Sequence, residues 1–289
     1  MKRNEWIQWA TNELKNAGIE TPRLDAEVLL AFVLRIERIR LHMYPEKEVE
    51  QDAGEQFEIL IKKRRDECPV AYLTGEQEFM GLQFMVTPEV LIPRPDTETL
   101  AETVLEWVKN TAGSEKIQLA DIGTGSGAIA VSLAYYCPAI QVVATDLSHD
   151  ALKIAEENAK RHHVLSRIEF LYGDLMEPLI EKKYVLDALV SNPPYITEKE
   201  AESLPGSVAG YEPMLALLGG KDGLDPYRKI LAEGLELLRP GALVAFEMGW
   251  QQGEDLKSLM EEWGLEGVQI IKDLSGRDRV TTGYKQSCQ

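Results

Sequence analysis

The chain has 289 residues, of which 44% are hydrophobic and 27% are charged, and its formal net charge at pH 7 is −17. This length accommodates one large domain and a smaller one, and the composition is that of an ordinary globular protein. The acidic excess argues against a partner held mainly through phosphate contacts, because such binding requires clustered lysine and arginine. We therefore expect no stable binding of nucleic acid.

Three cysteines, Cys68, Cys137 and Cys288, share no disulfide or metal-ligand spacing. The first residues lack the apolar stretch of a signal peptide, and no segment is long and apolar enough to span a membrane. We therefore expect a reduced, cytoplasmic protein that has no structural metal, binds no membrane and acts as a monomer.

The first quarter of the chain has the periodicity of amphipathic helices. Apolar residues recur at helical spacing from residue 4 to about residue 75, and we expect residues 1–75 to form a small helical bundle. From Gln77 the pattern changes to alternation about Gly81, which predicts a short hairpin. We interpret residues 76–92 as a hairpin connector that leads into a second domain at residues 93–289.

The sequence Leu-Ile-Pro-Arg-Pro-Asp-Thr-Glu at residues 91–98 leads into a further helix. Its prolines stiffen the chain, and Asp96 or Thr97 can cap the helix that follows. Two interpretations stay open from these residues: a simple helix entry, or a rigid loop that carries Arg94 in the wall of a pocket.

Beyond Lys116, strands and helices alternate, which predicts an α/β fold with a mostly parallel sheet and helices on both faces. The expected parallel strands span residues 117–120, 141–144, 168–171, 186–190 and 242–246. A helix is expected at residues 148–162, with Ser148 as its N-cap. Residues 268–272 and 280–284 predict an antiparallel pair that closes the sheet.

A glycine-rich loop, Asp-Ile-Gly-Thr-Gly-Ser-Gly at residues 121–127, follows the first of these strands. Its glycines permit the backbone to approach a ligand at the carboxyl edge of the sheet, where open α/β folds bind ligands. The spacing differs from the pyrophosphate fingerprint G-x-G-x-x-G, which disfavours a nicotinamide or flavin cofactor.

Two acidic residues follow the next two strands. Asp146 can accept hydrogen bonds from ribose hydroxyls, and Asp174 can accept from an adenine amino group. Each acid alone is also compatible with a helix cap or a solvated turn. Because the glycine loop and both acids lie at one edge of the sheet, the combination favours an adenosyl cofactor without a pyrophosphate.

The segment Ser-Asn-Pro-Pro-Tyr at residues 191–195 ends the fourth strand. Its prolines lack N–H groups, so the chain stops pairing and presents mainly acceptors: the side-chain oxygen of Asn192 and the backbone carbonyls of Asn192, Pro193 and Pro194. Such a tip suits a planar –NH2 group, with the ring of Tyr195 packed on its plane. A plain proline-terminated strand end is the alternative.

Together these motifs resemble the S-adenosylmethionine-dependent methyltransferases of the Rossmann-like class. Further segments look like the peptide chain release factor N5-glutamine methyltransferases, over a stretch from about Tyr72 to Tyr284. They are Phe79-x-Gly81, residues 91–98, residues 191–195, Glu212-Pro213 with residues 215–217, residues 219–224, Glu247-x-Gly249 and residues 273–279. The resemblance implies a methyltransferase domain with a seven-stranded sheet, preceded by a helical bundle that recognises the substrate.

The resemblance also implies a cofactor, a substrate and roles for individual residues. The cofactor is S-adenosyl-L-methionine, and the substrate is the glutamine of the Gly-Gly-Gln motif in class-1 release factors. Catalysis falls to Asn192, Pro193 and Tyr195, and substrate binding to Arg94, Pro95, Thr97, Asn192, Pro193, Pro194 and Tyr195. Cofactor binding falls to Asp121, Gly123, Thr124, Gly125, Ser126, Gly127, Asp146, Leu147, Asp174, Leu175 and Asn192. Some members have an aromatic residue at the position of Leu175, so what packs on adenine is open.

Two other functions remain at this point. A methyltransferase for the exocyclic amines of nucleic acid would use the same acceptor tip, although the acidic composition counts against it. A non-catalytic module that binds the cofactor would be expected to lack some of the glycines, Asp146 or Asn192, and all of them are present.

Overall fold

The computed structural model describes residues 1–111 and 116–286, which form two compact units. Met1–Glu76 and Pro205–Tyr211 make up the helical unit, and the rest of the described chain makes up the sheet unit. The hydrophobic core of the helical unit is separate from the cores of the sheet unit. Cys288 lies outside the described residues.

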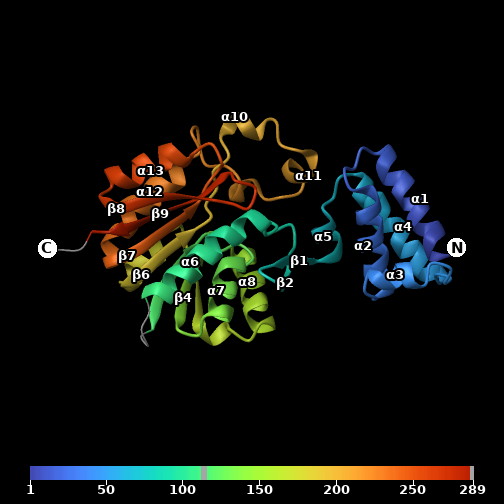
Figure 1. Ribbon diagram of the computed structural model, residues 1–289, viewed down its shortest axis with the longest axis horizontal. Helices are drawn as coiled ribbons and strands as arrows, with labels where there is room; N and C mark the ends of the chain where they lie inside the picture. The colour runs from blue at the N-terminus through green and yellow to red at the C-terminus, as the bar shows by residue number, and fades with distance from the viewer. Residues whose placement is uncertain (112–115, 287–289) are drawn as a thin grey trace. The chain divides into compact units, whose positions relative to one another are not determined.

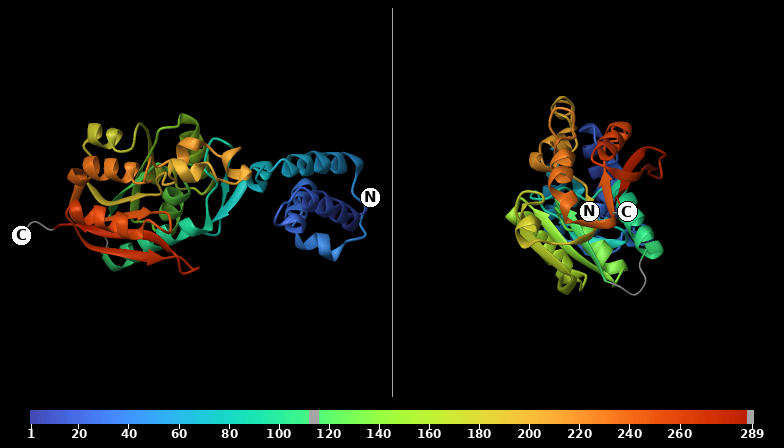
Figure 2. Two further views of the ribbon diagram at one scale, coloured as in Figure 1. Left: turned by 90° about the horizontal axis from the view of Figure 1, so that it is seen from above. Right: turned by 90° about the vertical axis from the view of Figure 1, so that its left-hand side faces the viewer.

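The helical unit confirms the helical periodicity of the N-terminal region. Its helices are α1 (Arg3–Asn16), α2 (Pro22–Leu34), α3 (Ile39–Met43), α4 (Gln51–Arg65) and α5 (Val70–Thr74). They surround a core that includes Leu14, Leu29 and Phe57, and Figure 2 shows them from two further directions. Proline starts α2, where its missing N–H leaves no helical hydrogen bond unmade.

Pro205–Tyr211 belongs to the helical unit although it lies far along the chain. It contains the short helix α11 (Gly206–Ala209), and the Tyr211 hydroxyl donates to the carbonyl of Asp66 at 2.6 Å. No sequence signal indicated this assignment, because the segment has neither helical periodicity nor strand alternation.

The predicted hairpin is confirmed as a two-stranded sheet of β1 (Glu76–Phe79) and β2 (Leu82–Met85). Gly81 adopts φ +73 at the turn, in the left-handed region that glycine tolerates best. Phe79 and Phe84 are fully buried and pack edge to face in a core of the sheet unit. The hairpin is therefore anchored by two aromatic side chains.

The main sheet has seven strands in the order β5-β4-β3-β6-β7-β9-β8. Pairing is parallel from β5 to β7, and β9 is antiparallel to both β7 and β8, as predicted. The strands are β3 (Ile117–Ile122), β4 (Ile140–Asp146), β5 (Ile168–Tyr172), β6 (Leu186–Ser191), β7 (Leu238–Glu247), β8 (Leu265–Lys272) and β9 (Asp278–Lys285). β4 and β5 lie on one side of β3, and β6 and β7 lie on the other, so the strand order switches at β3. The carboxyl ends of β3, β4 and β6 therefore meet at the edge where ligands bind in such sheets.

Helices cover both faces of the main sheet (Figure 1). One face packs against α6 (Glu98–Thr111), α7 (Ala128–Tyr136) and α8 (His149–Arg161), and the other against α9 (Glu177–Lys182), α12 (Asp225–Gly234) and α13 (Gly253–Glu262). The short helix α10 (Glu198–Ala201) follows β6. Ser148 caps α8 as predicted, since its hydroxyl accepts from the Ala151 N–H at 3.1 Å.

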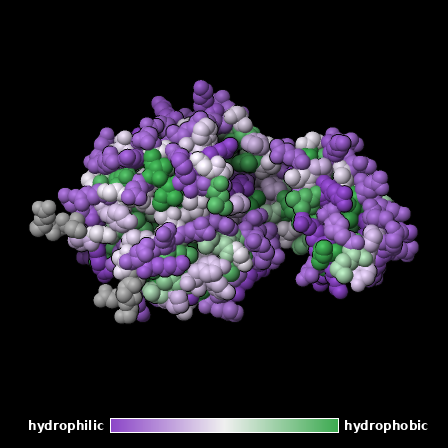
Figure 3. Space-filling model, in the orientation of Figure 1, coloured by the Kyte–Doolittle hydropathy of each residue, from purple (hydrophilic) through white to green (hydrophobic). Residues whose placement is uncertain are grey.

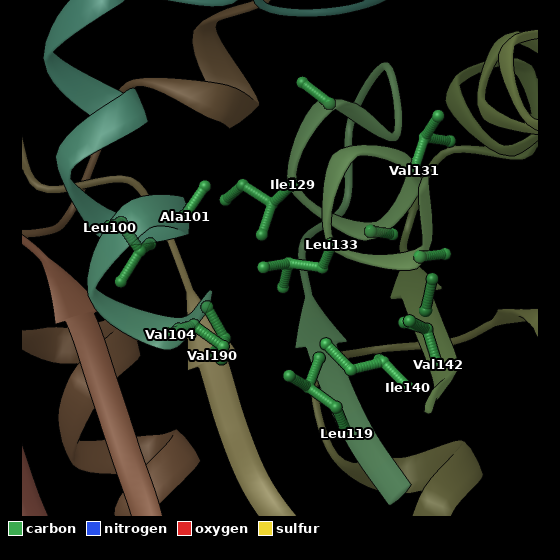
Figure 4. Close-up of a cluster of buried hydrophobic side chains, with 14 of the residues drawn as sticks. Leu100, Ala101, Val104, Leu119, Ile129, Val131, Leu133, Ile140, Val142 and Val190 are labelled. Carbon is green, nitrogen blue, oxygen red and sulfur yellow. The ribbon is translucent and has the colours of Figure 1, made fainter. Parts of the chain in front are cut away.

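Figure 4 shows how the core positions the start of α6. Leu100 and Val104 project from α6 toward the sheet, next to Val190 near the end of β6. All three side chains are fully buried. Burying a side chain of this size stabilises a fold by about 1.5–3 kcal/mol, so the loop before α6 is held close to the residues that follow β6.

Hydrophilic residues dominate the face of the molecule in Figure 3, and hydrophobic residues occur there in small separate groups. Within residues 1–111 and 116–286, no helix combines the length and the apolar character needed to cross a membrane. The same residues contain no group of three His, Cys, Asp or Glu side chains that could hold a metal ion.

Candidate active site

The glycine loop leaves β3 through left-handed backbone. Gly123, Gly125 and Gly127 have φ of +71, +56 and +79, which residues with a Cβ rarely adopt. A Cβ added at Gly123 or Gly125 would meet nothing within 4 Å, whereas one at Gly127 would lie 3.0 Å from the Cβ of Ala155. The first two glycines therefore leave open space above the loop, and the third allows α8 to approach it.

Asp146 ends β4 and fastens this loop. Its Oδ2 accepts from the Gly125 N–H at 2.8 Å, and its Oδ1 accepts from the Ser148 N–H at 2.9 Å. Burial raises the pKa of the Asp146 carboxyl, although these backbone hydrogen bonds oppose the shift. Each oxygen has a further lone pair, so the carboxylate can still accept from a ligand hydroxyl.

Asp121 lies behind the loop and is fully buried. Its Oδ2 accepts from the Thr124 hydroxyl at 2.7 Å and from the Ala130 N–H at 3.2 Å, while its Oδ1 has no hydrogen-bond partner. Burial raises the pKa of Asp121 to about 7. The carboxyl group thus ties the loop to the first turn of α7.

A cavity of about 440 Å³ opens at this edge of the sheet unit. Small-molecule sites commonly span about 300–1,000 Å³. The predicted residues that line it are Gly123, Gly125, Asp146, Leu147, Asp174, Leu175, Asn192 and Pro194. Asp121, Thr124, Ser126 and Gly127 are not part of the wall, and the first three are buried behind it.

Asp174 follows β5 and lies in the cavity wall, but one of its carboxylate oxygens is already engaged. Its Oδ2 accepts from the Nζ of Lys229, a residue of α12 that also lines the cavity. This hydrogen bond, which Lys229 donates to Asp174, raises the pKa of Lys229. Leu175, beside it, has φ +49, and its carbonyl accepts from the Thr145 hydroxyl at 3.0 Å.

The acceptor tip begins where β6 ends. The buried Ser191 hydroxyl donates to the carbonyl of Ile122 at 2.6 Å, which joins the ends of β6 and β3. Asn192 and Pro194 then line the cavity, so they share it with the glycine loop and Asp146. Pro193 is buried and is not part of the wall.

Tyr195 does not line the cavity. Its ring packs partly buried against the core on the α12 face, and burial raises the pKa of its hydroxyl well above the ordinary value. Its backbone carbonyl accepts from the Nε2 of Gln252 at 3.2 Å. The cavity wall therefore gives no support to the expected stacking of the Tyr195 ring on a substrate group.

Three glycines lie against the tip, and at two of them a Cβ would clash with a backbone carbonyl of the tip. A Cβ at Gly219 would lie 2.6 Å from the Pro194 carbonyl oxygen, and one at Gly223 would lie 2.3 Å from that of Tyr195. A Cβ at Gly249 would lie 3.4 Å from the ring of Tyr195. Backbone from residues 219–223 thus packs directly on the tip, which gives a physical reason for the glycines noted there in the sequence.

The loop at residues 91–98 meets the site differently from expectation. Arg94, Pro95 and Thr97 are absent from the cavity wall, which instead contains Glu89, Val90 and Leu91 just before them. The guanidinium of Arg94 pairs with the buried carboxylate of Glu212. The expected pocket wall at this loop therefore exists, but Leu91 at the start of the motif and its two predecessors form it in place of Arg94.

The side chains expected to cap α6 make tertiary contacts. Asp96 pairs with Arg279 of β9 at 3.0 Å, and the Thr97 hydroxyl accepts from the Nδ2 of Asn192 at 3.2 Å. A short 3-10 turn, Pro95–Thr97, runs directly into α6. Both contacts join segments that are far apart in the sequence, and the spacing of residues along the chain cannot predict such contacts.

Other residues that line the cavity were not predicted from the sequence. Lys229 belongs to no motif noted in the sequence, and neither do Asp225 and Pro226, which begin α12. Residues 215–217 were noted through resemblance but without a role, and two of them, Leu215 and Ala216, line the cavity together with Leu218, which was not noted. The signal that could have found them is their position in the crossover after β6, beside the carboxyl edge of the sheet.

Two family profiles match the chain: the PrmC N-terminal domain at residues 5–75 and the methyltransferase small domain at residues 97–205. Among solved structures, a methyltransferase from Pyrococcus furiosus superposes with a TM-score of 0.52 at 20% identity, over 81% of this chain and 99% of that one. The hMettl16 catalytic domain gives a TM-score of 0.55 at 17% identity, over 81% and 82% of the two chains. These likenesses concern the fold alone.

Full-length relatives are more informative. The release factor glutamine methyltransferase of Moorella thermoacetica is 46% identical over 96% of each chain. That of Clostridium acetobutylicum is 38% identical over 99% of each chain, and that of Bacillus anthracis is 38% identical over 97% of this chain and 98% of its own. By this similarity along nearly its whole length, the chain belongs to the release factor glutamine methyltransferase family.

Proposed function

We propose that this protein transfers a methyl group from S-adenosyl-L-methionine to the side-chain amide nitrogen of the Gly-Gly-Gln glutamine in class-1 release factors. One observation carries the proposal: Asn192 and Pro194 of the acceptor tip line the same cavity as Gly123, Gly125 and Asp146. A methyl donor and a planar –NH2 group can therefore occupy adjacent parts of one site.

The residues at the glycine end fit the proposed cofactor. Open space above Gly123 and Gly125 lets backbone approach a ligand, and the carboxylate of Asp146 has lone pairs free for ribose hydroxyls. Asp174 retains an oxygen beyond the one that Lys229 engages, so it can accept from an amino group. When bound, S-adenosyl-L-methionine supplies a methyl group on a positively charged sulfur.

The acceptor tip would orient the glutamine amide. The side-chain oxygen of Asn192 and the backbone carbonyl of Pro193 would each accept one N–H of the –NH2 group, as the resemblance implies. An amide nitrogen is a poor nucleophile, and the two acceptors favour the positive charge that develops on it during transfer. Orientation of reactants can supply on the order of 7–11 kcal/mol, so the proton can leave after transfer without a dedicated base.

Mass spectrometry of a release factor after incubation with this protein and S-adenosyl-L-methionine tests the proposal. We expect one added methyl group, on the glutamine of Gly-Gly-Gln. Radiolabelled methyl donor offered with release factor, RNA and DNA separates the rival substrates. Label in nucleic acid and none in the release factor would overturn the proposal, and no label anywhere would favour a binding module.

A further inference from the structure

The orientation of the Asn192 side chain decides whether the acceptor tip can work. The oxygen and the –NH2 group of a carboxamide are nearly equal in size, so only hydrogen bonds determine which of them points into the cavity. A substrate amide offers two N–H donors and needs acceptors. If the Asn192 –NH2 group faced the cavity, two donors would oppose each other.

Thr97 is the residue that contacts the other side of this carboxamide. The Nδ2 of Asn192 donates to the Thr97 Oγ1 at 3.2 Å, and Thr97 is 5% exposed and outside the cavity wall. A hydroxyl can both donate and accept, so Thr97 by itself is compatible with either orientation of Asn192. A third group must direct the Thr97 proton.

Glu247 supplies that direction. It ends β7, directly beside β6, where Ser191 and Phe246 are register partners. Its carboxyl group is 1% exposed, its Oε2 has no hydrogen-bond partner, and the Thr97 side chain is the neighbour that most favours its ionised form by lowering its pKa. An ionised carboxylate only accepts, so it takes the Thr97 proton and leaves the Thr97 oxygen to accept from the –NH2 group of Asn192.

The surroundings of Glu247 bring its titration close to neutral pH. Burial raises its pKa to about 7, with the Thr97 hydrogen bond and the positive charge of Arg279 opposing the shift. The charged and titratable groups that face it are Arg94, Asp96, Tyr195, Tyr227 and Arg279. Protonated Glu247 can itself donate to Thr97, and Thr97 can then donate to Asn192 and permit the wrong orientation.

We propose that Thr97 and Glu247 are positioning residues that hold Asn192 with its side-chain oxygen toward the methyl-accepting nitrogen. The inference rests on the proposed function and adds to it the reason why the loop at residues 91–98 accompanies the acceptor tip. Neither residue touches the substrate. Their effect on catalysis passes entirely through the orientation of Asn192.

Thr97→Val removes the hydroxyl while preserving the shape of the side chain, and Thr97→Ser keeps the hydroxyl. We expect Thr97→Val to lower kcat for release factor methylation on the order of 100-fold, because misplacement of a reacting group has effects of that size. Thr97→Ser should restore most of the rate, and the Kd for S-adenosyl-L-methionine should stay unchanged in both variants. Thr103→Val is the matched control, since the Thr103 hydroxyl only donates to the Thr99 carbonyl within α6.

A Thr97→Val variant that binds the cofactor normally and turns over like the wild type would overturn the inference. Loss of activity in Thr97→Ser equal to that in Thr97→Val would also overturn it, because the shape and not the hydroxyl would then matter. A wild-type protein that methylates no release factor would instead overturn the proposed function itself.

The pH dependence of kcat separates a positioning role of Glu247 from a merely structural one, because a structural role would leave this dependence unchanged. At saturating substrates, kcat of the wild type should fall as the pH decreases through about 7, the pKa of Glu247. In Glu247→Gln this acidic limb should disappear, since a glutamine does not titrate. Persistence of the limb in Glu247→Gln would assign it to another group, such as Asp121, whose pKa is also raised to about 7, and would overturn the role of Glu247.

Discussion

Asn158 and Met85 exchange two hydrogen bonds: the Asn158 Oδ1 accepts from the Met85 N–H at 2.7 Å, and its Nδ2 donates to the Met85 carbonyl at 3.0 Å. The same nitrogen donates to the carbonyl of Ser126 at 2.9 Å. Asn158 is fully buried. One side chain of α8 therefore holds both the hairpin strand β2 and the glycine loop of the site.

Replacing Asn158 with alanine should destabilise the sheet unit. The change leaves buried backbone groups of Met85 and Ser126 without partners, and each such group costs about 1–3 kcal/mol. We expect urea denaturation to show a loss of at least about 2 kcal/mol in the free energy of unfolding. Asn110→Ala, on the exposed end of α6, is the control and should stay within about 0.5 kcal/mol of wild type. Equal stability of the two variants would contradict the role assigned to Asn158.

Asn192→Ala should separate chemistry from cofactor binding. The variant loses the proposed acceptor for the substrate amide, and removal of one preorganised group that stabilises developing charge costs about 10²- to 10³-fold in kcat. The hydrogen bonds of Asp146 to Gly125 and Ser148 do not involve Asn192, so calorimetry should give nearly the wild-type Kd for S-adenosyl-L-methionine. Near-normal turnover by this variant would exclude Asn192 as the amide acceptor.

Asp146→Ala should have the opposite effect. Its carboxylate holds the glycine loop through the Gly125 N–H and is the proposed acceptor for ribose hydroxyls. A hydrogen bond to a charged group contributes about 1.5–3 kcal/mol, so the Kd for the cofactor should rise about 10- to 150-fold. Calorimetric titration measures it, with Asp150→Ala as control because Asp150 is exposed on α8 and pairs only at the surface with Lys153. A shift in Kd of similar size for both variants would point to a general loss of charge.

Gly223 and Gly241 form a matched pair for testing the packing on the acceptor tip. Their φ values are +75 and +79, so alanine strains the backbone similarly at both. A Cβ at Gly223 would lie 2.3 Å from the Tyr195 carbonyl oxygen, whereas one at Gly241 would meet nothing within 4 Å. We expect Gly223→Ala to lower kcat at least 10-fold more than Gly241→Ala, because it displaces the tip. Steady-state kinetics at saturating cofactor measure kcat of both variants. Equal kcat values for Gly223→Ala and Gly241→Ala would show that the close packing of Gly223 on Tyr195 does not affect catalysis.

The stability of the protein should depend on Glu247 in a defined pH range. The pKa of Glu247 is raised from 4.5 to about 7, so the native state keeps its proton where the unfolded state has lost it. The contribution of Glu247 to stability is therefore greatest below pH 4.5 and falls as the pH rises toward 7. At about 1.4 kcal/mol for each tenfold change in the acid dissociation constant, the upper bound of this loss is about 3.5 kcal/mol.

Glu247→Gln removes that dependence, so its advantage over the wild type in the free energy of unfolding should grow between pH 5 and pH 8. Denaturant unfolding at both pH values measures the difference. Glu254→Gln, exposed in the first turn of α13, should give a difference near zero at both. A Glu247→Gln advantage that is larger at pH 5 than at pH 8 would contradict the raised pKa.

Much of the sheet unit was predictable because its signals are local. Alternating strands and helices predicted a mostly parallel sheet, which the pairing from β5 to β7 confirms. The glycines of residues 121–127 predicted a loop that can approach a ligand closely, and the structure adds that Gly123, Gly125 and Gly127 have positive φ. The two prolines after Asn192 predicted the end of β6, which stops at Ser191. Each of these features depends on the residues of one short segment, so it can be recognised without knowing what packs against it.

The tertiary structure decided which residues of each motif face the cavity. Gly123 and Gly125 line it, whereas Thr124 and Ser126, between and after them in the chain, turn away into the protein. Thr97 looked like a helix cap and lies instead against Asn192, with Glu247 behind it. The sequence by itself determined the kind of site, because backbone chemistry is local. The direction of each side chain depends on packing between strands and helices that come together only in the folded protein, and this packing cannot be predicted from the spacing of residues along the chain.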